Sequence, residues 1–165
     1  MADETPTTDW DTWLTANAGR FLLFARQQAR CLHDAEDILQ EALVESWRRS
    51  GGKPEAALVF TTIRRRAIDL GRRTDRRTHR EERASAEVTH FTVSAGDEPG
   101  IDLAELEQAL KHLPASQRDV LTLKFWGGLT FAEVATTLEI PPGTAASRYR
   151  LALETLRETL TATVP

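Results

Sequence analysis

The last third of the chain shows apolar residues at helical spacing, interrupted by residues that begin or end helices. A helix is predicted with Pro114 in its first turn, where the missing N–H of proline costs nothing. Gln117 and Arg118 are expected to face solvent. The glycine pair at 127–128 is predicted to end the helix, because glycine accepts the left-handed conformation of a C-terminal cap. The apolar side of this helix consists of Val120, Leu121 and Leu123.

Two more helices are predicted after the glycine pair. Thr130 and Glu133 have the spacing of a capping box, which begins a helix. Pro-Pro-Gly at 141–143 interrupts the chain, and a last helix is predicted from there to about Thr159, with Ala145 turned into the core. Short helices joined by a turn are typical of a helix-turn-helix, whose later helix enters the major groove of DNA. The residues expected to reach bases or phosphates there are Thr144, Ser147, Arg148 and Arg150.

In the order of its motifs, this part of the chain resembles region four of bacterial sigma factors, which reads the minus-thirty-five promoter element. The resemblance covers residues 110–156 and depends on the succession Leu-Pro, Gln-Arg, Gly-Leu-Thr, Glu-Val-Ala and Pro-Gly-Thr-Ala-Ala-Ser-Arg. The family commonly has a basic residue where this chain has Ala146. The C-terminal domain of response regulators has a similar pattern, so this half alone leaves two families open.

The N-terminal half contains a predicted amphipathic helix that begins with acidic residues. Its carboxylates cluster in the first turn, where they interact favourably with the helix dipole. The apolar residues Ile38, Leu39, Leu43 and Trp47 recur at helical spacing, and Trp47 is interpreted as a core residue. The segment Asp-Ala-Glu-Asp, followed by Gln-Glu, resembles sigma region two, where it docks on a coiled coil of the polymerase β′ subunit. By this resemblance, the polymerase-binding residues are Asp34, Asp37, Gln40 and Glu41.

An arginine-rich stretch follows this helix. Residues 61–73 are similar to the sigma-factor helix that opens the minus-ten element. Residues 64–83 contain nine arginines and four acidic residues, a local charge of +5 that is typical of phosphate binding, although a solvated helix face is the alternative. An aromatic residue that stacks on an unpaired base is expected near residues 50–58. Phe60, just after this range, is the only nearby candidate. The residues assigned to the minus-ten element are Arg64, Arg65, Arg72 and Arg73.

Charge is distributed unevenly along the chain. The whole sequence has 21 basic and 25 acidic residues, and its net charge of −4 by itself argues against nucleic-acid binding. The arginine-rich stretch reverses that inference. Residues 84–110, in contrast, contain six acidic residues and no lysine or arginine. An acidic flexible linker is predicted over residues 84–101, either as a tether or as a segment that follows a basic channel, between domains at 1–83 and 102–165.

Composition limits the remaining function classes. No apolar run approaches the roughly 20 residues of a membrane span, and the acidic start differs from a signal peptide. The lone Cys31 cannot form an internal disulfide, so a cytoplasmic protein is predicted. His33, Asp34 and Glu36 lie near Cys31 but do not share one helix face with it, so surface polar residues are favoured over a metal site. Without a phosphate loop or a nucleophile motif, no enzymatic activity, catalytic residue or cofactor is expected.

Together these features predict an all-α protein with two small helical domains joined by a flexible linker, the second containing the helix-turn-helix. The two matches in this order resemble an extracytoplasmic-function (ECF) sigma factor, the smallest sigma class, which keeps only these two domains. The resemblance implies binding to the β′ and β subunits of core RNA polymerase, recognition and opening of promoter DNA, and control by an anti-sigma factor. Two alternatives stay open: a helix-turn-helix regulator that binds duplex DNA without melting it, and a sigma mimic that occupies an anti-sigma factor.

Overall fold

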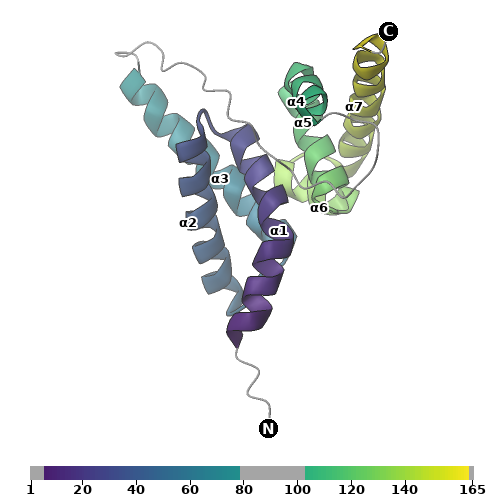
Figure 1. The fold of residues 1–165 in the computed structure, drawn as a ribbon. Coiled ribbons are helices and arrows are strands. Elements are labelled where there is room, and N and C mark those ends of the chain that lie inside the picture. The colour runs from purple at the N-terminus through teal and green to yellow at the C-terminus, as the bar shows by residue number, and fades with distance from the viewer. Residues whose placement is uncertain (1–5, 79–102, 164–165) are drawn as a thin grey trace. The chain divides into compact units, whose positions relative to one another are not determined.

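The structure, a computed structural model, describes residues 6–78 and 103–163 (Figure 1). These two ranges are helical and contain no β-strand, which confirms the predicted all-α class. They form two compact units, one with helices α1–α3 and one with α4–α7. The predicted linker and both predicted domain boundaries fall among residues 79–102, outside the described residues, and stay a prediction.

The first unit consists of three helices joined by short connections: α1 (Pro6–Gln28), α2 (Leu32–Ser50) and α3 (Ala56–Thr78). Phe60 of α3 is fully buried at the centre of the unit. Its ring packs edge-on against Phe21 and Phe24 of α1, with centroids 5.0 and 5.5 Å away. Phe60 is therefore excluded as the candidate for stacking on a promoter base, because its side chain is part of the core.

Helix α2 buries a narrow stripe in which three of the four side chains are small. Its buried residues are Ala35, Ile38, Ala42 and Ser46, at successive spacings of three and four. The predicted apolar stripe is thus displaced, since Leu39 and Leu43 are only half-buried. Trp47, predicted as a core residue, remains 38% exposed, and its ring lies edge-on against Trp10, with centroids 4.4 Å apart. The small buried residues allow α2 to approach its neighbours closely.

The second unit contains α4 (Leu103–His112), α5 (Ala115–Leu121), the π-helical turn η1 (Thr122–Trp126), α6 (Phe131–Leu138) and α7 (Pro142–Thr163). Its core brings together Leu110, Leu113, Leu121 and Ala152, with the partly buried Trp126, Tyr149 and Leu156 packed around them. Pro114 is the N-cap residue of α5. It precedes the first helical residue, whereas it was expected within the first turn. Gln117 and Arg118 are half-buried, contrary to the expected solvent face, with the Gln117 Oε1 and Arg118 Nε atoms enclosed.

The glycine pair after η1 closes this helical segment for two separate reasons. The Gly127 N–H donates to the Thr122 carbonyl at 2.9 Å, the wider spacing of a π-helix. A Cβ atom at Gly127 would lie 2.3 Å from the Leu123 carbonyl oxygen, so only glycine fits there. Gly128 has a φ of 67°, in the left-handed region that favours glycine. The predicted helix end is confirmed, with a π-helical turn before it.

Helix α6 begins and ends with well-defined local contacts. The Glu133 N–H donates to the Thr130 Oγ1 atom at 3.1 Å, and the Thr130 N–H donates to the Glu133 Oε1 atom at 3.1 Å. These two bonds confirm the predicted capping box. At the other end, Glu139 has a φ of 56°, which is unusual for a residue with a side chain. Helix α7 follows and continues to Thr163, beyond the predicted end at Thr159.

Candidate functional site

The residues assigned to polymerase binding lie on the side of α2 that faces away from its buried stripe. Asp37, Gln40 and Glu41 are exposed, whereas Asp34 in the first helical turn is half-buried. Val44 lies one turn beyond Gln40 on the same side and is 51% exposed. The structure therefore presents the four predicted residues as one polar surface that ends at an exposed apolar residue. This surface, with Val44 included, is called the α2 face below.

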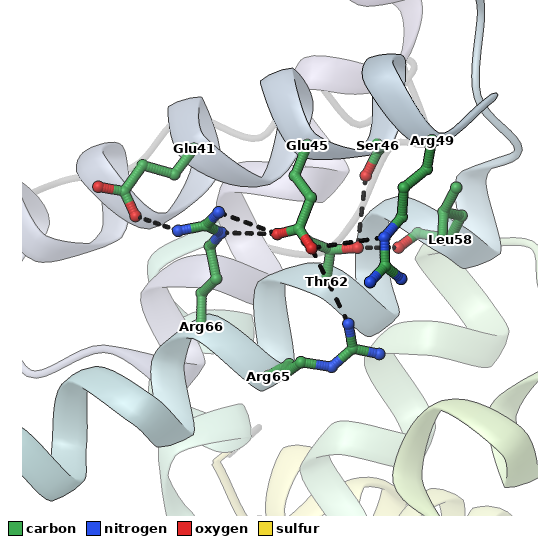
Figure 2. Close-up of polar contacts among 8 residues, drawn as sticks. All are labelled: Glu41, Glu45, Ser46, Arg49, Leu58, Thr62, Arg65 and Arg66. Atoms are coloured by element: carbon green, nitrogen blue, oxygen red, sulfur yellow. Dashed lines mark hydrogen bonds and ion pairs between the residues drawn. The ribbon is translucent and has the colours of Figure 1, made fainter. Parts of the chain in front are cut away.

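A network of ion pairs connects the α2 face to α3 (Figure 2). The Arg66 Nη1 atom lies 2.7 Å from the Glu41 Oε2 atom, and the Arg66 Nε atom donates to the Glu45 Oε2 atom at 2.9 Å. The other oxygen of Glu45 lies 3.6 Å from the Arg49 Nε atom and 4.0 Å from the Arg65 Nη1 atom. One carboxylate of α2 thus faces three guanidinium groups, and Arg66 divides its donors between two carboxylates.

Buried polar contacts fix the register of α2 and α3 behind this network. The Ser46 Oγ atom donates to the Thr62 Oγ1 atom at 3.4 Å, and the Thr62 hydroxyl donates to the Leu58 carbonyl at 2.7 Å (Figure 2). Ser46 and Thr62 are completely buried. Because buried hydroxyls need partners, a sliding of α3 along α2 would take the Thr62 acceptor away from the buried Ser46 hydroxyl. The same register keeps Arg66 opposite Glu41 and Glu45.

An open surface depression of about 480 Å³ covers the outer side of the ion-pair network. Its lining is mainly charged, with Val44 as the apolar contribution. Because two glutamates and three arginines line it, a partner surface would meet charged groups of both signs beside the apolar Val44. The lining residues are Gln40, Glu41, Val44, Glu45, Arg48, Arg49 and Arg66.

The four arginines assigned to the minus-ten element do not share one side of α3. Arg65 and Arg72 are exposed and lie seven residues apart, so they form one outer stripe of the helix. Ile68 lies between them on this stripe and is 39% exposed. Arg64 precedes Arg65 by one residue, and Arg73 follows Arg72 by one residue. Each is therefore rotated by about 100° from the stripe, in opposite directions, and the two lie on opposite flanks of the helix. Arg64 is half-buried, whereas Arg73 is exposed.

The predicted reading residues at the start of α7 are also divided. Ser147 and Arg150 are exposed, whereas Thr144 and Arg148 are half-buried. Ala145 is completely buried, as predicted. The structure thus makes two of the four predicted side chains fully accessible and places the other two nearer to the body of the unit.

Aromatic contacts hold α7 against α6. The Tyr149 ring packs edge-on against Phe131, with centroids 5.6 Å apart. The Lys124 Nζ atom of η1 lies 4.7 Å from the centroid of the same Phe131 ring, within the range of a cation–π interaction. Phe131 therefore links η1, α6 and α7, and fixes the orientation of the helix that carries the reading residues.

Two residues of the site are missed by sequence reasoning. Arg66 belongs to the arginine-rich stretch but is not among the assigned residues, and Glu45 lies one turn after Glu41. The four-residue spacing of Glu41 and Glu45 indicates one side of α2. No local pattern indicates that their common partner lies more than twenty residues later, on another helix.

The described residues add two further findings about the chain. No group of three or more His, Cys, Asp or Glu side chains within them is arranged to hold a metal ion. None of their helices is sufficiently long and apolar to cross a membrane.

Comparison with known families and proteins identifies both units. The family model described as Sigma-70 region 2 matches residues 13–77, and the model described as Sigma-70, region 4 matches residues 103–156. The ECF RNA polymerase sigma factor SigK of Mycobacterium ulcerans is 34% identical over 146 residues, which cover 81% of this chain and 78% of SigK. The RNA polymerase sigma-E factor of Streptomyces avermitilis is 33% identical over 127 residues, which cover 77% of this chain and 71% of that protein.

A solved structure shows the same fold. The sigma factor RpoE of Bartonella quintana, solved in complex with the anti-sigma factor NepR, matches with a TM-score of 0.68 and 24% sequence identity. The match covers 94% of this chain and 98% of RpoE. From the two matched regions and the full-length relatives together, the chain belongs to the ECF sigma factors, which direct RNA polymerase in transcription initiation.

Proposed function

We propose that this sigma factor uses three helix faces for three separate tasks. The α2 face binds core RNA polymerase, the arginines of α3 engage the minus-ten element, and the start of α7 reads the upstream element. The observation that carries the proposal is the amphipathic construction of α2. Its small residues are buried in the unit, while the four predicted polymerase-binding residues point away from them. A helix of this kind has one side for its own core and a polar side that a partner can reach.

Polymerase binding would depend on charge complementarity around an apolar contact. Asp37 and Glu41 supply negative charge, and the exposed Val44 supplies apolar surface next to them. Such a pattern raises the association rate with a basic partner surface and fixes the position in which that surface binds. An apolar side chain of the partner would bury Val44 at the same time, with the free-energy gain of apolar surface removed from water.

Strand engagement would use the outer stripe of α3. Arg65 and Arg72 are separated by about 10 Å along the helix axis, so they can contact different phosphates of one DNA strand. Arg64 and Arg73, on the two flanks, would reach the strand only where it bends around the helix. Each guanidinium that neutralises a phosphate releases counterions, so binding should weaken steeply with salt.

Upstream recognition would use the N-terminal part of α7 in the major groove. Ser147 and Arg150 are the accessible residues for base edges, and the half-buried Thr144 and Arg148 are suited to phosphates near the protein surface. The Phe131 contacts with Tyr149 and Lys124 would keep α7 rigid during docking. A rigid reading helix loses less conformational entropy when it binds.

The protein would perform no covalent chemistry of its own. It would deliver core polymerase to a subset of promoters and hold one melted strand, and it would act in the cytoplasm, where those partners are. A protein of the anti-sigma class is the expected antagonist. This part of the proposal is supported by the fold shared with Bartonella quintana RpoE, which was solved in complex with NepR.

In vitro transcription with purified core polymerase on a genomic library tests the proposal. Addition of the protein should produce transcripts from a limited set of start sites that core polymerase alone does not use. Duplex binding without such transcripts would favour the helix-turn-helix regulator. An absence of polymerase binding, together with capture of an anti-sigma factor, would favour the sigma mimic.

A further inference from the structure

Arg66 lies between the two proposed binding surfaces of the first unit. It originates from α3, but its guanidinium reaches Glu41 on the α2 face (Figure 2). The Arg66 side chain is 35% exposed and the Glu41 side chain is 61% exposed. Both partners of this ion pair are therefore accessible to ligands from solvent. A basic group can compete for Glu41 and a phosphate can compete for Arg66.

The two carboxylates hold different parts of the Arg66 guanidinium. Glu45 accepts from Nε and faces Nη2, each at 2.9 Å, whereas Glu41 accepts only from Nη1, at 2.7 Å. Glu45 is also the less exposed carboxylate, at 25%. Loss of Glu41 would therefore leave Arg66 anchored to Glu45 and would free the Nη1 edge. A planar guanidinium has donors on several edges and can serve two acceptors at once.

The freed edge would lie on a flank of α3 that already has a proposed DNA contact. Arg66 and Arg73 are seven residues apart and thus share one stripe of the helix. Arg73 is exposed. In the free protein, Glu41 neutralises the Arg66 end of this stripe. When Glu41 is occupied by another cation, the stripe gains one donor for a phosphate oxygen.

We propose that the Glu41–Arg66 ion pair couples polymerase binding to DNA binding. A basic group of core polymerase takes Glu41, and the Nη1 edge of Arg66 then becomes available to the DNA strand. Coupling between two sites is reciprocal, so DNA on Arg66 also makes Glu41 a better partner for polymerase. This inference rests on the proposed roles of the α2 face and of α3. It makes Arg66 a DNA-binding residue whose availability depends on what occupies Glu41.

The test uses the full chain without polymerase and a fluorescein-labelled oligodeoxythymidine as the single-stranded probe. Glu41→Gln imitates the occupied carboxylate, because it removes the negative charge that holds Nη1. Affinity for the probe should rise by about two- to fivefold, the range of an exposed ion pair. The slope of log K against log salt should become steeper by about 0.7, the value of one additional phosphate contact with a single strand.

Glu36→Gln is the matched control. It makes the same substitution on the same helix, but Glu36 is exposed and takes no part in the ion pairs of Glu41, Glu45 and Arg66. Its salt slope should equal that of the natural sequence. The double variant with Glu41→Gln and Arg66→Gln should lose the gain. Equal slopes for Glu41→Gln and Glu36→Gln would overturn the inference, because net charge alone would then account for any effect. A gain that persists without Arg66 would also overturn it.

A separate binding measurement distinguishes this inference from the proposed function. Core polymerase is titrated with the natural sequence and with Asp37→Asn. If Asp37→Asn leaves polymerase affinity unchanged, the assignment of the α2 face fails, whatever the DNA measurement gives. If polymerase affinity falls but the Glu41→Gln salt slope does not change, the face is correctly assigned and the coupling through Arg66 is wrong.

Discussion

The two units of the molecule position their functional residues in different ways. In the first unit, side-chain contacts between helices do this, since Arg66 connects α3 to two carboxylates of α2. In the second unit, Gly127 and the capping box of Thr130 fix the ends of the short helices, and aromatic packing between Phe131 and Tyr149 then holds α7. The first arrangement depends on ion pairs between exposed groups, whereas the second depends mainly on backbone geometry and aromatic packing. This difference fits the proposed roles of the α2 face in partner binding and of α7 in reading a duplex.

The largest effect is expected from the backbone of the second unit. Gly127→Ala forces the new Cβ atom to within 2.3 Å of the Leu123 carbonyl oxygen, which cannot move without disrupting η1. We expect the unit to lose about 3 kcal/mol of unfolding free energy, typical of strain in a packed backbone. Urea unfolding of the full chain measures it. Gly143→Ala is the control, because its Cβ would meet no atom within 4 Å; equal losses for both would contradict the account.

The next largest effect is expected on polymerase affinity in the first unit. Replacing Asp37 and Glu41 together by lysine places positive charge opposite a basic partner surface. Affinity for core polymerase should fall by about tenfold or more, equivalent to about 1.4 kcal/mol or more. Equilibrium binding with labelled core polymerase measures the change. Asp11→Lys, at an exposed position of α1, should have little effect, and an undiminished affinity of the double variant would remove the α2 face from the interface.

A smaller effect is expected from the start of α6. Thr130→Ala removes the acceptor for the Glu133 N–H and should destabilise the second unit by about 1 kcal/mol. Thermal unfolding followed by circular dichroism measures it. Thr136→Ala is the control within the same helix, where alanine is the better helix former. Its stability should stay the same or rise. A control variant as unstable as Thr130→Ala would show that the capping box is not the cause.

The smallest effect is expected at the end of α6. Glu139 is exposed and adopts a φ of 56°, a conformation that glycine accepts without a steric penalty. Glu139→Gly should therefore stabilise the second unit by about 0.5 kcal/mol, after the entropic cost of glycine in the unfolded chain is subtracted. The denaturant midpoints of the two proteins measure the change, provided that the dependence of unfolding free energy on denaturant concentration is the same in both. A loss of stability would mean that the Glu139 side chain contributes more than its backbone strain costs.

The sequence predicts the features of this fold that depend on neighbouring residues. The three-residue spacing of Thr130 and Glu133 predicts a capping box. The glycine pair at 127–128 predicts a helix end, because glycine adopts backbone conformations that other residues avoid. The burial of Phe60 could not be predicted, because burial depends on which helices surround a residue. Likewise, no local pattern marks η1 as π-helical, since its geometry depends on packing around the segment.

The candidate site divides in the same way. Sequence alone places Asp37 and Glu41 on one side of α2, because their spacing of four is the helical repeat. It does not reveal that Arg66 holds Glu41, because that contact requires the register of two helices. The register depends on buried hydroxyls of Ser46 and Thr62, which have no distinctive sequence pattern.

Permanganate footprinting of a promoter complex tests most directly whether the two units have different tasks. Core polymerase is combined with the natural sequence, with a variant carrying Arg65→Ala and Arg72→Ala, or with Arg150→Ala. The account predicts that the α3 variant still occupies the upstream element but leaves the minus-ten thymines unreactive. Arg150→Ala should reduce occupancy and reactivity together. Equal melting by the α3 variant and the natural sequence would contradict the central claim that the first unit opens the promoter.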